Sequence, residues 1–149
     1  IGDLSDGDIN VKVDKGVVYV DISDKLLFKS GSFNITDKAK VVLGKVAKVL
    51  AAQPAIEFMV EGHTDSKQLI SGGSLMEDNW DLSVKRATTI VRVLQDTYGI
   101  DPKRMTAAGR SEYIPVVENN SAENRAANRR TRIVILPQLD QFFKSLEKK

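Results

Sequence analysis

The sequence predicts an α/β domain of the α+β sandwich type, in which a mixed β-sheet carries its helices on one face. Three observations lead to this prediction. Two long segments have apolar residues at helical spacing, several short segments are rich in β-branched residues, and the two kinds alternate along the chain. The expected order is strand, helix, strand, helix, strand, strand, a βαβαββ-like arrangement. No internal repeat or low-complexity linker interrupts it, so one domain is the simplest organisation.

The chain begins with a hairpin pattern. Ile9–Val13 and Gly16–Ile22 are typical of two short strands joined by a tight turn at Asp14–Gly16. The apolar run Leu26–Phe28 follows, and Phe28 is expected to belong to the core.

The first long helix is expected to follow Thr36, whose side chain is a suitable N-cap. Apolar residues then recur at helical spacing and predict one buried face, made of Ala39, Val42, Leu43, Val46, Ala47 and Leu50. The lysines of this segment fall largely on the opposite face, which predicts a solvated surface. Pro54 ends the helix.

A buried strand, Ile56–Val60, then leads into the polar turn Glu61–Asp65. The polar, glycine-bearing loop Ser66–Asp78 separates this turn from a second amphipathic helix, for which Ser83 is the candidate N-cap. Gly99 ends that helix.

Two further strands complete the predicted sheet. Met105–Ala108 is a short strand, Glu118–Arg130 is expected to be loop with a short helix, and Thr131–Leu136 is the final strand. Residues 1–137 are therefore expected to form the domain. Residues 138–149 are expected to form an amphipathic tail helix that packs on the domain or on another chain, as in a homodimer.

Composition excludes several functions. The chain has 149 residues, a formal net charge of +2, one histidine and no cysteine. This balance gives no reason to expect nucleic-acid binding. Without cysteine, and with His63 as the only imidazole, neither a metal site nor a cofactor is expected. The longest apolar stretches are too short to span a bilayer. No signal peptide is visible in Ile1–Asn10, so we expect a fragment or a mature form.

Charged residues predict a binding site at one end of the sheet. Asp65 follows the buried strand, Arg86 lies near the start of the second helix, and Arg129 and Arg130 precede the last strand. An acid and two or three arginines would suit a zwitterion, because a carboxylate binds an ammonium group and a guanidinium binds a carboxylate through two hydrogen bonds. A purely structural ion pair between Asp65 and Arg86 remains the alternative on spacing alone.

Three motifs, Gly62–Asp65, Asn79–Ala87 and Asn128–Arg130, occur in this order and become recognisable as a set. Together they resemble the OmpA-like peptidoglycan-binding domain, which outer-membrane OmpA, the lipoprotein Pal and the flagellar stator protein MotB share. The resemblance covers about residues 17–137 and implies the OmpA-like fold.

The resemblance implies a non-enzymatic function. The family binds the stem peptide of peptidoglycan and grips diaminopimelate, whose side chain ends in both an ammonium and a carboxylate. This chain is therefore expected to anchor an envelope protein to the cell wall. It would lie in the periplasm, attached to the outer membrane, or alternatively to the inner membrane, through an anchor or barrel outside this chain.

The resemblance also implies roles for individual residues. Asp65 resembles the family's ligand-binding aspartate and Arg86 its ligand-binding arginine. Arg129 matches the first arginine of the family's Asn-Arg-Arg motif, which supplements the pocket. Other residues correspond to the lining of the same pocket: Thr64, Asn79 and Leu82. For Trp80 we expect packing beside Leu82, and for Arg130 a structural ion pair.

Two other functions stay open. The chain resembles MotB-like members at Asn79 and Trp80, and it could serve as a stator or other envelope interaction module whose loop Ser66–Asp78 or tail binds protein. A hydrolase is the third hypothesis, with His63 as its only candidate imidazole base. The chain also departs from the family, because Lys29–Gly31 stands where many members carry an aspartate shortly after the equivalent of Phe28.

Overall fold

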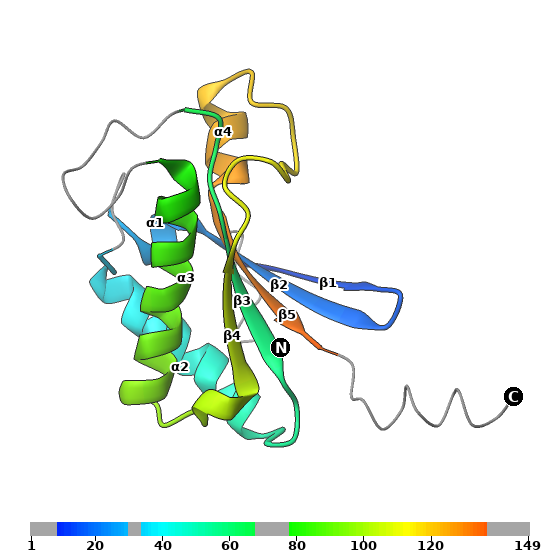
Figure 1. The fold of residues 1–149 in the computed structure, drawn as a ribbon, viewed down its shortest axis with the longest axis vertical. Helices are drawn as coiled ribbons and strands as arrows, with labels where there is room; N and C mark the ends of the chain where they lie inside the picture. Colours follow the sequence, from blue (N-terminus) through cyan, green and yellow to red (C-terminus); the bar gives the residue numbers. More distant parts are fainter. Residues whose placement is uncertain (1–8, 30–33, 68–77, 137–149) are drawn as a thin grey trace, which may run out of the picture.

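The structure, a computed structural model, describes residues 9–29, 34–67 and 78–136. A five-stranded sheet lies at its centre, with strand order β1-β2-β5-β3-β4 (Figure 1). The strands are β1 (Ile9–Asp14), β2 (Val17–Ser23), β3 (Phe58–His63), β4 (Met105–Gly109) and β5 (Arg130–Ile135). The helices are α1 (Asp24–Leu27), α2 (Asp37–Ala51), α3 (Asn79–Asp96), the 3₁₀ turn η2 (Pro102–Arg104) and α4 (Ala122–Asn128).

The sheet is mixed, as the sequence predicts. β3 and β4 run parallel, and the other neighbouring strands pair antiparallel. The expected element order is correct in outline, but it counts four strands where the described residues form five, because β1 and β2 stand in it as one strand. It also lacks the short helix α1, which replaces the apolar run expected after β2. The tail over 138–149, the segment 30–31 and most of the loop Ser66–Asp78 lie outside the described residues.

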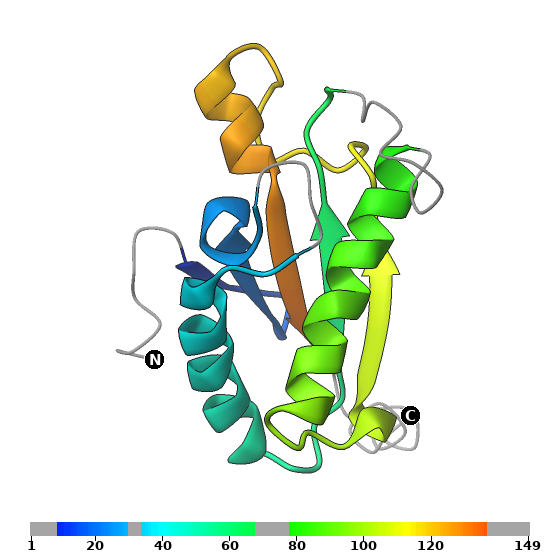
Figure 2. The ribbon, with the colours of Figure 1, turned by 90° about the vertical axis from the view of Figure 1, so that its left-hand side faces the viewer.

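Helices α2 and α3 cover one face of the sheet, as Figure 2 shows. Alternate strand residues meet them there, including Phe58 and Val60 of β3 and Ile133 of β5, all fully buried. Thr36 caps α2 as predicted, since its hydroxyl accepts a hydrogen bond from the backbone N–H of Ala39 at 3.1 Å. Phe28 belongs to the core, as expected.

Helix α3 begins earlier than predicted. Asp78 is its N-cap, with the carboxylate accepting from the backbone N–H of Asp81 at 3.1 Å. Ser83 is therefore not the cap. It lies in the second turn, where its hydroxyl donates to the carbonyl of Trp80 at 2.9 Å. Arg86 consequently lies two turns into the helix and not in its first turn.

The opposite face of the sheet carries charge. In the register of the strands, Asp21, Arg132 and Glu61 lie side by side on β2, β5 and β3. Arg132 donates to both carboxylate oxygens of Asp21, at 2.7 and 3.1 Å. Within the described ranges, none of the helices is long and apolar enough to cross a membrane.

Candidate functional site

Three strand ends meet at one edge of the sheet. Because β5 runs antiparallel to both neighbours, its first residue Arg130 lies between Ser23 at the end of β2 and His63 at the end of β3. The next residues along the chain therefore gather at this edge. The backbone N–H of Asp24 donates to the carbonyl of Arg129 at 3.0 Å, which ties the start of α1 to the start of β5.

Two glycines allow α3 to approach this edge. Gly62 of β3 pairs with Gly109 of β4, and both face Ser83. A Cβ on Gly62 would lie well under 3.0 Å from the Ser83 carbonyl oxygen, and one on Gly109 would lie 2.8 Å from the backbone nitrogen of Val84. Arg86, one turn beyond Ser83, is brought to the same edge by this close packing.

Two acids and two arginines form a chain of ion pairs there. Arg129 donates from Nη1 to Asp65 at 2.6 Å, and its Nε lies 3.7 Å from Asp24. Asp24 also forms an ion pair with Arg86. The guanidinium of Arg86 lies over the ring of Phe28, 4.9 Å from its centroid.

The members of this cluster differ in exposure. The Arg86 side chain is 3% exposed and that of Asp24 10%, whereas that of Arg129 is 37% exposed. Burial raises the pKa of Asp24, and the neighbouring Arg86 and Arg129 offset only a part of that shift. Burial also disfavours the charged form of Arg86 and so lowers its pKa. The Asp24–Arg86 pair therefore has a high desolvation cost, while Arg129 is the partner with freedom to move.

The remaining predicted residues hold the backbone around Asp65. Thr64 is buried, donates from its hydroxyl to the Asp65 carbonyl at 3.1 Å, and is tied through its N–H to Ser111. Asn79 donates to the carbonyls of Asp65 and Lys67 at 3.3 and 2.9 Å. Leu82 is 5% exposed. The hydrogen bonds of Thr64 and Asn79 thus support the Asp65 segment.

A buried hydrogen bond joins His63 to Glu61 next to the site. His63 is 1% exposed, and its Nε2 donates to Glu61 at 2.7 Å. Burial lowers the pKa of His63, although Glu61 beside it acts in the opposite direction. Burial alone would raise the pKa of Glu61, but His63 and Arg110 together hold it below its ordinary value.

The structure thus brings Asp65, Arg86 and Arg129 to one edge, as the sequence predicts. It differs in the pairing: Asp65 pairs with Arg129 and Arg86 pairs with Asp24, rather than Asp65 with Arg86. Asp24 was missed. Its only signal in the sequence is an acid at the end of a predicted strand, and the lone carboxylate has no distinctive spacing.

Two expectations for neighbouring residues need correction. Trp80 is 48% exposed, and its ring lies 5.5 Å from that of Tyr113 at an interplanar angle of 36°. Its ring partner is thus Tyr113 and not Leu82, because residues two positions apart in one helix do not face each other. Arg130 donates to the carbonyls of Asn128 and Ile114, at 3.1 and 3.0 Å, and not to the acids expected as its partners.

The charges of the four central side chains cancel. Asp24, Asp65, Arg86 and Arg129 together carry two negative and two positive charges, arranged alternately. Such a site suits a ligand that has one ammonium and one carboxylate, since each group finds an opposite charge. In the described part of the chain, no three His, Asp or Glu side chains gather as a metal site requires.

Comparison with known proteins gives a consistent result. The model of the OmpA family matches residues 27–129. Motility protein B of Bacillus subtilis is 31% identical over 129 residues, which are 87% of this chain and 49% of that protein. Outer membrane protein Omp38 of Acinetobacter baumannii is 31% identical over 106 residues, 71% of this chain and 28% of that protein. The chain spans about half or less of these relatives' length.

Solved structures share the fold. A MotB-like protein from Desulfovibrio vulgaris superposes with a TM-score of 0.81 at 31% identity, covering 89% of this chain and 80% of that chain. The cell wall anchor of the T6SS from Pseudomonas aeruginosa superposes with a TM-score of 0.78 at 33% identity, covering 88% and 89%. The fold expected from the sequence is confirmed by these neighbours.

Proposed function

Since the chain belongs to the OmpA family, we propose that it binds the stem peptide of bacterial peptidoglycan and so anchors an envelope protein to the cell wall. The family is one of binding and anchoring domains and not of enzymes. The proposed ligand group is diaminopimelate, whose side chain ends in an ammonium and a carboxylate. The observation that carries this proposal is the alternating row of Asp65, Arg129, Asp24 and Arg86.

The row suggests how the ligand enters. The ammonium replaces Arg129 at the carboxylate of Asp65, and the ligand carboxylate lies against Arg86. Arg129, the most exposed of these ion-paired side chains, turns from Asp65 to the incoming carboxylate. Each charge-assisted hydrogen bond contributes about 1.5–3 kcal/mol, so the exchange loses one such bond and forms two or more.

Asp24 has a positioning role in this proposal. Its carboxylate holds Arg86 from the side of α1, while Phe28 lies against the guanidinium. A buried arginine with one carboxylate and one ring against it keeps a single orientation. Thr64 and Asn79 act in the same way on Asp65, because both fix the backbone around that residue.

The names of similar proteins support a place in the cell envelope. One neighbour is a cell wall anchor, and one relative is an outer membrane protein. We therefore place the domain in the periplasm, where peptidoglycan lies. Attachment to the outer membrane is our first proposal and attachment to the inner membrane the second.

A second candidate function follows from the match with Motility protein B over 87% of this chain. The domain would then serve a motility complex, and the charged pocket would be secondary to contacts with other proteins. Deleting residues 66–78 distinguishes the two functions. Lost partner binding with retained wall binding favours the motility complex, and lost wall binding favours the anchor.

Co-sedimentation with purified sacculi tests the anchor function. Asp65→Asn removes the charge but keeps the shape, and Arg86→Lys keeps the charge but removes the planar fork. Both changes are expected to weaken sedimentation by about tenfold or more. Asp96→Asn and Arg92→Lys, at exposed positions of the same helix α3, are the matched controls and should sediment normally. Equal sedimentation of all four variants would refute the anchor function.

A further inference from the structure

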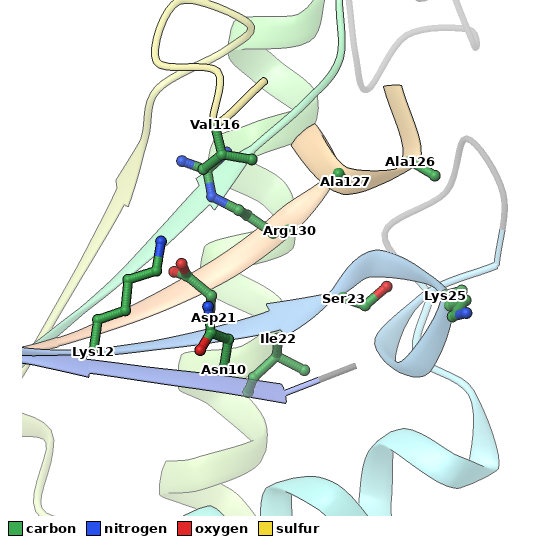
Figure 3. Close-up of a pocket in the computed structure, with 10 residues that line it drawn as sticks. All are labelled: Asn10, Lys12, Asp21, Ile22, Ser23, Lys25, Val116, Ala126, Ala127 and Arg130. Atoms are coloured by element: carbon green, nitrogen blue, oxygen red, sulfur yellow. The ribbon is translucent and has the colours of Figure 1, made fainter. Parts of the chain in front are cut away.

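A cavity of about 380 Å³ lies on the side of the sheet opposite α2 and α3 (Figure 3). The β1–β2 hairpin forms one wall, and the other is formed by α4 with the segment around Val116. The charged residues that line it are Asp21, Lys12, Lys25 and Arg130. Asp65, Arg86 and Arg129 do not belong to its lining, so the cavity is separate from the site above.

The cavity is positively charged. Three of its lining side chains are cationic and one is anionic, and that one, Asp21, already accepts two hydrogen bonds from Arg132. Lys12 is exposed and makes no ion pair with any residue that the structure describes. Lys12 and Arg130 therefore offer a small anion positive charge that no ion pair within the described residues compensates.

Arg130 is the buried cation of this cavity. It is 5% exposed, and its two terminal nitrogens donate to the neutral carbonyls of Asn128 and Ile114. Its Nε has no hydrogen-bond partner among the described residues. Burial lowers the pKa of Arg130 to about 10, so the side chain remains charged at neutral pH. A buried guanidinium without a carboxylate partner is unfavourable, and an anion in the cavity would reduce that cost.

The position of the cavity relates it to the proposed function. Arg129 belongs to the zwitterion site and Arg130 to the cavity, although the two are consecutive at the start of β5. Asp24 and Lys25 divide in the same way at the start of α1. The two sites thus flank the same strand ends.

We propose that this cavity binds a peptide carboxylate of the same wall polymer, so that one domain holds a cross-linked peptidoglycan unit at two points. This inference rests on the proposed function, which supplies the first point. The cavity contributes the second point through Arg130 and Lys12, with Lys25 adding charge at its rim. Two-point binding predicts higher affinity for a cross-linked unit than for a single peptide, because the second contact forms at high effective concentration.

The test is an NMR titration of the ¹⁵N-labelled chain with two fragments from sacculi, a single disaccharide-peptide and its cross-linked dimer. The single unit should shift the amides of Thr64 and Asn79. The dimer should also shift those of Lys12, Ser23 and Ala127 around the cavity. Lys12→Glu should weaken dimer binding about tenfold and leave single-unit binding within about twofold. Lys38→Glu, an equal change of charge on the exposed face of α2, should alter neither.

The outcomes separate the two proposals. If neither fragment shifts Thr64 and Asn79, the proposed function fails. If the dimer shifts those amides but none around the cavity, or if Lys38→Glu weakens the dimer as much as Lys12→Glu, only the cavity proposal fails. A third titration uses inorganic phosphate. Shifts around the cavity with phosphate and none with the dimer would overturn the carboxylate assignment.

Discussion

The backbone of Gly62 lies directly against the carbonyl of Ser83, so closely that a Cβ on Gly62 would come well under 3.0 Å from that oxygen. This contact places α3 on β3 and therefore places Arg86 beside Asp24. The arrangement of the ion pairs among Asp65, Arg129, Asp24 and Arg86 therefore depends on a contact between two uncharged residues.

Gly62→Ala is expected to lower the free energy of unfolding by about 2 kcal/mol, the usual cost of overpacking. It should also weaken ligand binding, because α3 must move away from the sheet. Chemical denaturation measures the first effect. Gly44→Ala is the comparison, since the atoms nearest its new methyl group belong to the Tyr98 side chain, at 3.2 Å or more, and can move aside. An equal loss of unfolding free energy in Gly62→Ala and Gly44→Ala would contradict the claim that close packing against Ser83 requires glycine at position 62.

Asp24→Ala is expected to cost about 3 kcal/mol of stability, because it leaves Arg86 buried without its carboxylate. Replacing both residues, as Asp24→Ala with Arg86→Met, should restore much of that loss, since no buried charge is then left uncompensated. Denaturation of the two single variants and the double variant gives the coupling energy. A double variant less stable than Asp24→Ala would contradict this account, because it would show that buried Arg86 stabilises the fold even without its carboxylate.

His63 is the only histidine in the chain, so it dominates the side-chain titration between pH 7.5 and 5.5. Burial holds its pKa in the folded state below 6.5. The unfolded chain therefore binds the proton more readily, and the stability that neutral His63 contributes is present above pH 6.5 and is lost as pH falls. The slope cannot exceed about 1.4 kcal/mol per pH unit for one proton.

Melting temperatures measured across this range should fall as pH falls. His63→Gln keeps a donor for Glu61 but does not titrate, so its melting temperature should change much less. If the melting temperature of His63→Gln fell as steeply with pH as that of the wild type, the titrating group would not be His63.

Arg129→Gln should separate the binding of the ligand ammonium from the binding of the ligand carboxylate. Its loss frees Asp65 of its partner but removes one donor for the ligand carboxylate. Nα-acetyl-lysine amide, whose only charged group is the side-chain ammonium, should then bind at least as well as to the wild type, while diaminopimelate should bind about tenfold more weakly. Calorimetric titration with both ligands measures the contrast. If Arg129→Gln lost affinity equally for both ligands, Arg129 would not contact the ligand carboxylate.

The sequence predicts the sheet and the long helices because their patterns are local. Apolar residues at helical spacing give α2 its buried face, and Thr36 marks its start. The predicted start of α3 was wrong because Asp78 and Ser83 are both suitable N-caps. The choice between them depends on how α3 packs against Gly62 and Gly109. That packing is not visible in the order of residues.

The pairing inside the site could not be predicted for a related reason. Asp65, Arg86 and Arg129 were found as members of motifs, but Asp24 belongs to none of them. Its role comes from the antiparallel register, which brings the end of β2 against the start of β5. An isolated carboxylate becomes recognisable only when the strands are assembled.

Titration of the chain with free diaminopimelate, followed by NMR at the amides of Thr64 and Asn79, tests the central claim most directly. The account predicts saturable binding, with Nα-acetyl-lysine amide and the Asp65→Asn variant each weaker by about tenfold or more, because each removes one charge-assisted contact. Equal affinity for that blocked lysine and diaminopimelate, or undiminished binding by Asp65→Asn, would contradict the zwitterion site.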